Sequence, residues 1–227
     1  MSTSAKEPVD NRLRILLAAE ELFASQGFAA TSVREIVQRA DVTAPVLYYY
    51  FGSKDELLTT LVSERFEEYI ERVIEASAQA HSVRDVVNMW CETLIDETVS
   101  RPTTLRLILG ALWGPPVPHL RKVVFQFHKR VIALYIDSLQ RCDPSISEER
   151  ARFSHVALNG MLNSFMFPIL QSNIATNPDD LVGAISPRIV AIIYDDSPIP
   201  TATLESLDSH IQQVLSTSSE STKLETP

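Results

Sequence analysis

Hydrophobic residues recur along the chain at the three- and four-residue spacing that is typical of amphipathic α-helices. No stretch of four or more residues alternates between apolar and polar side chains in the way that a half-buried strand does. The pattern predicts helices over about 10–26, 31–40, 44–51, 53–80, 82–100, 102–113, 120–141, 147–172 and 177–194, with a weaker one over 204–215. Ser186-Pro187 predicts a kink or break within the ninth of these segments. The expected fold class is therefore all-α.

The first three predicted helices are short and closely linked, which is typical of a helix-turn-helix. Gly27 and Gly52 follow the first and third helix as stop residues. Ser32 and Glu35 have the spacing of a capping box at the start of the second helix. Thr43 is the expected N-cap of the third helix.

Leu47 and Phe51 are four residues apart on the third helix, so they share one face and are expected to pack inward. The remaining faces carry three consecutive tyrosines, whose hydroxyls suit phosphate oxygens, and small apolar residues that suit thymine methyl groups in a major groove. Arg34 is the one side chain here that can make a bidentate contact with guanine, although a solvated or phosphate-bound arginine is an equal alternative.

Residues 31–57 resemble the TetR (tetracycline repressor) family, whose pattern is T-x-R-x-I-A-x-x-A-G-V-S-x-x-x-L-Y-x-H/Y-F-x-x-K-x-x-L. The resemblance extends over about residues 10–60, with the apolar positions, the aromatic run and the lysine all in register. Two positions depart from the pattern, because Asp41 replaces the usual turn glycine and Pro45 stands where glycine is common. The resemblance implies that DNA is contacted by Thr31, Ser32, Arg34, Thr43, Ala44, Pro45, Val46, Tyr48, Tyr49, Tyr50 and Lys54.

The resemblance also implies a helical regulatory domain that encloses a ligand and forms a dimer. We expect a DNA-binding domain over 1–55 with a flexible arm at 1–9, a helical-bundle ligand-binding and dimerisation domain over 56–215, and a disordered tail at 216–227. Residues 147–194 are strongly apolar and include small residues that allow close helix packing, which favours a homodimer interface there. A fully intramolecular core is the alternative. A two-fold dimer would bind a near-palindromic operator in double-stranded DNA.

Candidate ligand residues are large apolar side chains and the polar side chains that interrupt apolar stretches, and any single one of them is more often plain core. They suggest a small, hydrophobic effector. The candidates are Trp90, Arg106, Trp113, Phe127, His128, His155, Asn159, Met161, Asn163, Phe165 and Met166.

The formal net charge of −9 argues against DNA binding, and residues 1–60 themselves carry six basic and eight acidic side chains. Any DNA-binding surface must therefore be a small positive face on an acidic protein. No catalytic constellation, metal-ligand cluster or cofactor motif is present, and no run of apolar residues is long enough for a membrane span. The sequence thus predicts a cytoplasmic, ligand-released transcriptional repressor, with a helical ligand-binding or interaction protein that does not bind DNA as the alternative.

Overall fold

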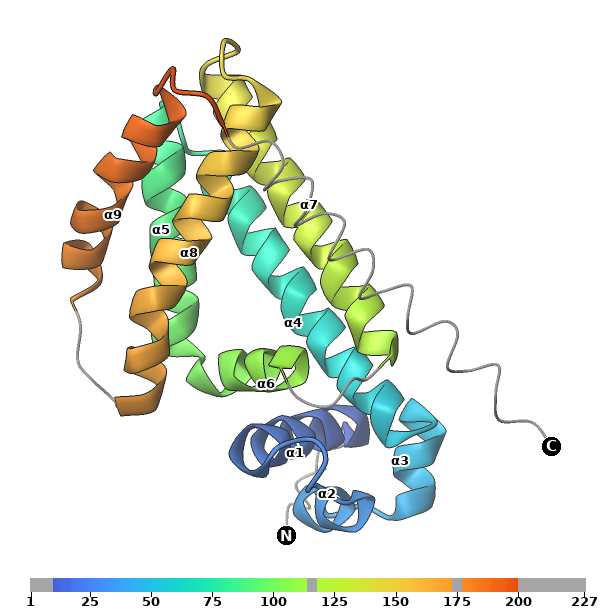
Figure 1. The fold of residues 1–227 in the computed structure, drawn as a ribbon. Helices are drawn as coiled ribbons and strands as arrows, with labels where there is room; N and C mark the ends of the chain where they lie inside the picture. The colour runs from blue at the N-terminus through green and yellow to red at the C-terminus, as the bar shows by residue number, and fades with distance from the viewer. Residues whose placement is uncertain (1–9, 114–117, 173–176, 200–227) are drawn as a thin grey trace, which may run out of the picture. The chain divides into compact units, whose positions relative to one another are not determined.

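The computed structural model describes residues 10–113, 118–172 and 177–199, and within them it contains helices and no strands. The helices are α1 (Asn11–Gln26), α2 (Val33–Ala40), α3 (Ala44–Phe51), α4 (Lys54–Ser77), α5 (Val83–Ser100), α6 (Pro102–Trp113), α7 (Pro118–Cys142), α8 (Glu148–Ser172) and α9 (Pro178–Ile193) (Figure 1). The all-α prediction is confirmed. The predicted arm at 1–9, helix at 204–215 and tail at 216–227 lie outside the described residues.

Helix α9 continues through Pro187, so the chain is not broken at Ser186-Pro187, and the alternative of a kink there stays a prediction. A proline within a helix lacks the N–H that would bond four residues back, and its ring crowds that residue's carbonyl. In α9 that residue is Gly183, and the helical assignment nevertheless runs unbroken from Pro178 to Ile193.

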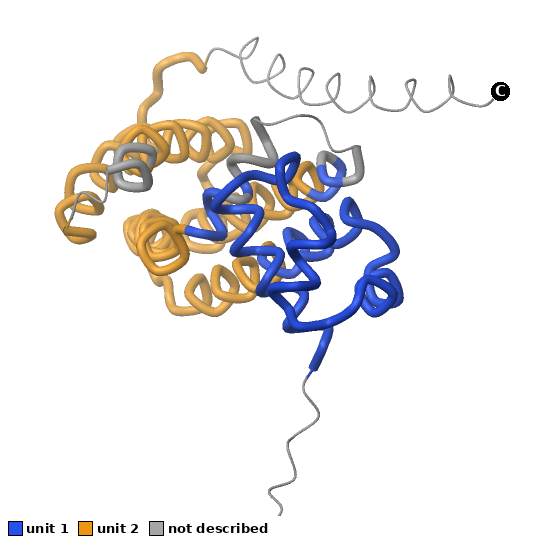
Figure 2. The backbone as a smooth tube through the Cα atoms, turned by 90° about the horizontal axis from the view of Figure 1, so that it is seen from below, with its two compact units in different colours: residues 1–65, 103–123 blue, residues 66–102, 124–227 orange. Residues whose placement is uncertain are grey.

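The chain divides into two compact units, residues 1–65 with 103–123, and residues 66–102 with 124–227 (Figure 2). The first unit contains α1 to α3 and the beginning of α4. In it α1 packs against α2 and α3, and the buried residues include Phe23, Ile36 and Leu47. The expected domain boundary at residue 55 remains a prediction, since the compact unit extends to Arg65 and includes a second segment.

The second unit is a bundle in which α5 packs against both α8 and α9. Its largest fully buried side chain is Tyr135 of α7. The rings of Phe66 on α4 and Phe127 on α7 stack with their centroids 3.8 Å apart. None of the described helices combines the length and the apolar character that a membrane crossing requires.

Candidate nucleic-acid interface

The turn between α2 and α3 is the most tightly defined local structure in the first unit. At the start of α2, the Ser32 hydroxyl accepts from the Glu35 backbone N–H, and the Glu35 carboxylate accepts from the Ser32 N–H at 2.8 Å. The Ser32 hydroxyl also donates to this carboxylate at 2.7 Å, and the bonds from the Ser32 N–H and hydroxyl lower the pKa of Glu35, the one from the backbone most strongly. The predicted capping box is confirmed, and it fixes where α2 begins.

Asp41 ends α2 in the left-handed conformation, with φ of 51°. Its N–H bonds to the Gln38 carbonyl and the Val42 N–H bonds to the Val37 carbonyl, which is the pattern of a Schellman motif. Arg14 of α1 donates to the Asp41 carboxylate at 2.9 Å and to its carbonyl at 3.2 Å. Asp41, which stands where the resembled pattern has glycine, is thus held in place by an arginine from another helix.

Helix α3 presents its aromatic residues on two opposite sides. Leu47 and Phe51 are buried, as their spacing predicts. Tyr48, Tyr49 and Tyr50 are 49%, 83% and 41% exposed, so they are not sealed beneath another element of the chain. Pro45 is also exposed, in the first turn of α3 where a proline does not disturb the helix. The face of α3 that the sequence predicts to contact DNA is therefore exposed.

The remaining candidates on or next to α2 and α3 fall into three groups by exposure. Ser32, Arg34 and Thr43 are exposed, while Ala44 and Val46 are half-buried beside the tyrosines. Thr31 is 1% exposed, and its hydroxyl donates to the Gly27 carbonyl at 2.8 Å. Its side chain therefore holds the loop between α1 and α2 and is not offered to a duplex.

Lys54, at the start of α4, lies over the ring of Phe28, with its ammonium 4.3 Å from the ring centroid. The same ammonium donates to the Phe28 carbonyl at 3.0 Å and to the Thr31 carbonyl at 2.8 Å. Two of its three protons are used within the unit, so one is left for a phosphate. Sequence reasoning missed this role, which joins α4 to the loop between α1 and α2.

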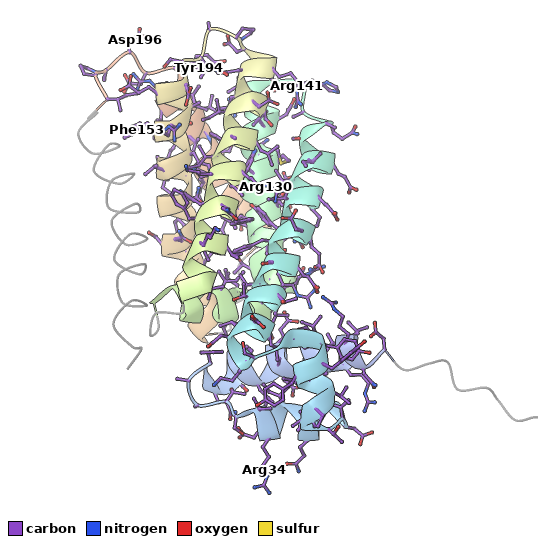
Figure 3. The ribbon with its side chains drawn as sticks, turned by 90° about the vertical axis from the view of Figure 1, so that its right-hand side faces the viewer. Arg34, Arg130, Arg141, Phe153, Tyr194 and Asp196 are labelled. Atoms are coloured by element: carbon purple, nitrogen blue, oxygen red, sulfur yellow. The ribbon has the colours of Figure 1, made fainter. Side chains whose placement is uncertain are left out.

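Several carboxylates of the first unit form ion pairs with arginines. Glu21 pairs with Arg39 at 2.6 Å, Glu20 with Arg65 at 2.7 Å, and Glu64 with Arg12. Among the described residues, Arg34 forms no ion pair, and its side chain extends away from α2 (Figure 3). Local pairing thus leaves a cation on a protein whose overall charge is negative.

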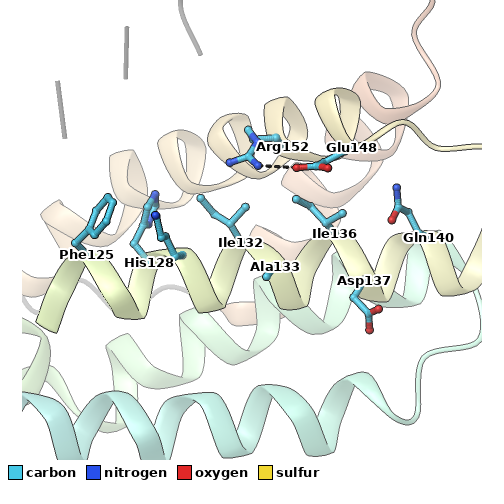
Figure 4. Close-up of a pocket in the computed structure, with 10 residues that line it drawn as sticks. Phe125, His128, Ile132, Ala133, Ile136, Asp137, Gln140, Glu148 and Arg152 are labelled. Carbon is cyan, nitrogen blue, oxygen red and sulfur yellow. Dashed lines mark hydrogen bonds and ion pairs between the residues drawn. The ribbon is translucent and has the colours of Figure 1, made fainter. Parts of the chain in front are cut away.

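In the second unit, a groove of about 540 Å³ lies between α7 and α8 (Figure 4). Of the predicted ligand residues whose side chains the structure describes, only His128 lines it. Its lining residues are Phe125, His128, Lys129, Ile132, Ala133, Ile136, Asp137, Gln140, Glu148 and Arg152.

Three other ligand candidates are buried. The Trp90 ring lies edge-on to Tyr135 at 5.2 Å and to His155 at 6.0 Å, and the His128 and His155 rings are also 6.0 Å apart. Asn159 donates to the His155 carbonyl at 2.9 Å, and Met166 is buried elsewhere on α8. Burial, with the charges of His128 and Arg152 adding to it, lowers the pKa of His155 to about 3.

The other candidates do not join this cluster. Phe127 stacks on Phe66, Met161 is half-buried, and Arg106, Asn163 and Phe165 are exposed, while the side chain of Trp113 lies outside the described residues. Within the cluster, the indole N–H of Trp90 is buried without a hydrogen-bond partner. Tyr135, whose hydroxyl lies 3.2 Å from that of Ser154, belongs to the cluster although the sequence did not single it out.

The capped α2, the three-residue turn and the exposed face of α3 define a helix-turn-helix protein. Residues 15–61 match the family described as bacterial regulatory proteins, tetR family. The chain is therefore similar to that family over its helix-turn-helix segment.

Similar proteins are found at both the sequence and the structure level. The probable HTH-type transcriptional regulator YttP of Bacillus subtilis is 35% identical over 88 residues, which cover 39% of this chain and 42% of that protein. EthR of Mycobacterium tuberculosis, an HTH-type transcriptional regulator, is 32% identical over 81 residues, or 36% of this chain and 37% of EthR. The chain thus spans less than half the length of these relatives.

Solved structures match over more of the chain and show the fold. Salmonella enterica GusR matches with a TM-score of 0.63 and 20% identity, over 85% of this chain and all of that one. The regulator FadR of Bacillus subtilis, solved in complex with stearoyl-CoA, matches with a TM-score of 0.66 and 16% identity, over 80% of this chain and 97% of that one.

Proposed function

We propose that the chain is a sequence-specific, DNA-binding transcriptional repressor that acts in the cytoplasm as a homodimer on a near-palindromic operator. The observation that carries this proposal is the exposed face of α3, where Tyr48 and Tyr49 lie open beside Pro45 on a helix whose other side is buried. Large aromatic side chains that remain exposed on a short, rigid helix are typical of a binding surface.

The chemistry of this face suggests how the operator is recognised. The start of α3 is small and apolar at Ala44, Pro45 and Val46, so it can approach thymine methyl groups in the major groove. The tyrosine hydroxyls and the exposed Ser32 hydroxyl suit phosphate oxygens, which position the protein but do not specify sequence. Arg34, which has no ion-pair partner among the described residues, is the candidate for a guanine contact.

We propose that α8 and α9 form the dimer interface, within the segment 147–194. On α8, Val156 and Phe165 are 37% and 43% exposed. Gly160 on α8 and Gly183 on α9 have no side-chain neighbours, so another helix can approach their backbones closely. A two-fold pairing of this face would present two copies of α3 to successive major grooves.

A small hydrophobic ligand is proposed to release the repressor from DNA. The buried cluster of Trp90, Tyr135 and His155 offers aromatic surface together with an indole N–H that has no partner, and His128 connects it to the groove between α7 and α8. The structure of FadR with stearoyl-CoA supports an apolar ligand class. Since α4 is continuous from the first unit into the second, a ligand that prefers one position of α4 would shift the population of DNA-competent dimers.

The proposal is tested by selecting duplexes from a random pool with the full chain and then measuring binding to the selected sequence. Arg34→Ala is expected to weaken binding by about 5- to 150-fold, the equivalent of about 1–3 kcal/mol for a bidentate guanine contact, and to relax selection at one base pair per half-site. Arg84→Ala removes one exposed positive charge from α5 and serves as the matched control, with affinity within about twofold of wild type.

The net charge of −9 favours a second candidate function, a helical ligand-binding protein that does not bind DNA. The two functions differ in the dependence of binding on salt. If the chain is a repressor, the selection should enrich a palindromic duplex. Its affinity for that duplex should fall steeply as the salt concentration rises, because phosphate contacts release counterions. A chain that enriches no duplex at low salt would support the second candidate.

A further inference from the structure

One stripe of side chains faces outward along the middle of α7, and we call it the α7 stripe. Its members follow one another at intervals of three, four, four and three residues, so they share one helical face about 21 Å long. They are Gln126, Lys129, Ala133, Asp137 and Gln140. The first four are exposed and Gln140 is half-buried. Figure 4 shows Asp137 turned away from α8.

The charges of the α7 stripe are placed symmetrically about Ala133. Lys129 lies four residues before it and Asp137 four residues after it, each about 6 Å away along the helix axis. The Lys129 ammonium lies 4.6 Å from the centroid of the Phe125 ring. Neither Lys129 nor Asp137 forms an ion pair with another described residue. The stripe therefore carries one positive and one negative charge at equal distances from a small central residue.

The two glutamines of the stripe repeat this symmetry, because each lies seven residues from Ala133. Gln140 uses its amide N–H to donate to the Ile146 carbonyl at 3.1 Å, so its amide oxygen is the group that it offers outward. Gln126 is exposed and has two N–H donors. If two copies of the stripe lay antiparallel with their Ala133 residues in contact, each lysine would face an aspartate and each Gln126 would face a Gln140.

We propose that the α7 stripe binds the α7 stripe of a second copy of the chain, antiparallel and across a two-fold axis at Ala133. A partner of uniform charge would match only one half of the stripe, whereas a second copy matches both halves. The small side chain of Ala133 allows the helix axes to approach to about 8 Å.

This inference goes beyond the proposed function and does not depend on it, because it adds a face for self-association that is separate from the exposed residues of α8 and α9. Exposed ion pairs each contribute little, so this contact forms at higher protein concentration than the proposed α8–α9 dimer and joins two such dimers.

Exchanging the two charges tests the pairing. In analytical ultracentrifugation of the full chain, the mass of the main species should double as the protein concentration rises. Lys129→Glu or Asp137→Lys places like charges opposite each other and should weaken this association at least about tenfold, while the double variant should restore it to within about threefold of wild type. Arg84→Glu reverses an exposed charge on α5 and should have no effect. Single variants that associate like wild type, or a double variant as weak as the single ones, would overturn the proposal.

Disulfide trapping tests the position of the two-fold axis. In a Cys142→Ser background, which removes the half-buried native thiol, Ala133→Cys should form a covalent dimer on oxidation, because the axis brings the two copies of this position together. Ala78→Cys places a thiol at another exposed alanine, just after α4, and should remain a single chain under the same conditions. Cross-linking of both variants at equal rates, or of neither, would contradict the pairing.

Discussion

At the scale of single residues, Asp41 shows how far the sequence alone can lead. It is the one non-glycine residue with positive φ among those the structure describes. Its place in the turn and its tolerance of the left-handed conformation follow from residue type. The partner that holds it does not, because Arg14 is 27 positions away and only the packing of α1 brings its guanidinium to the turn. Local patterns predict local geometry, whereas this bond depends on tertiary structure.

His155 leads to a prediction about pH. Because burial lowers its pKa from 6.5 to about 3, the unfolded chain binds a proton over a range in which the folded chain does not. Stability is therefore complete above pH 6.5 and falls as the pH decreases toward 3. His155→Gln should show a shallower decline, by up to about 1.4 kcal/mol per pH unit, in urea unfolding measured from about pH 7.5 to 4.

The same substitution at the exposed His81 provides the control, and it should retain the wild-type pH profile. If His155→Gln and His81→Gln give identical profiles, His155 is not the source of the acid sensitivity.

At the scale of helices, caps and stop residues made the boundaries predictable. The predicted and observed ends of α1, α3, α5 and α6 agree within a residue or two, since Gly27, Gly52, Ser82 and Pro102 act locally. At Pro187 the helix continues, which excludes the predicted break but leaves the predicted kink untested. Lys54 was identified as a candidate contact, but its bonds to the loop between α1 and α2 could not be read from spacing.

Those bonds lead to a prediction about Lys54. Lys54→Met keeps the aliphatic stem over Phe28 but removes the donor from two carbonyls, so the free energy of unfolding should fall by about 1–3 kcal/mol. Thermal or urea unfolding measures this. Lys122→Met removes an exposed lysine and should change stability by less than about 0.5 kcal/mol. A Lys54→Met protein as stable as wild type would show that the ammonium serves mainly an external partner.

At the scale of the whole molecule, the net charge argues against DNA binding, whereas the exposed tyrosine face of α3 favours it. Composition alone argues against DNA binding, and the pairing of Glu20, Glu21 and Glu64 with arginines uses one cation for each carboxylate, whereas Arg34 has no ion-pair partner among the described residues. The sequence predicted the exposed tyrosine face correctly, because helical periodicity determines which side of α3 is buried. The predicted ligand residues, in contrast, lie on several helices and do not form one site, because periodicity does not show which buried residues meet across a bundle.

The proposed dimer gives a prediction at this scale. Val156→Arg introduces a charge on the exposed side of α8 and should shift the chain from dimer to monomer, with at least about a tenfold weaker association, in analytical ultracentrifugation. Ile74→Arg makes the same change at a comparably exposed position on α4 and should leave the assembly intact. Dissociation by both variants, or by neither, would contradict an interface restricted to 147–194.

The hydrogen bonds and ring contact of the Lys54 ammonium also have a consequence for chemical labelling. An amine that donates to two carbonyls and lies against an aromatic ring is a poor nucleophile, whereas Lys122 is an exposed residue. Acylating reagents should modify Lys54 last in the native protein and rapidly once the first unit opens. Its modification would then report the integrity of the first unit, even in experiments where no DNA is present.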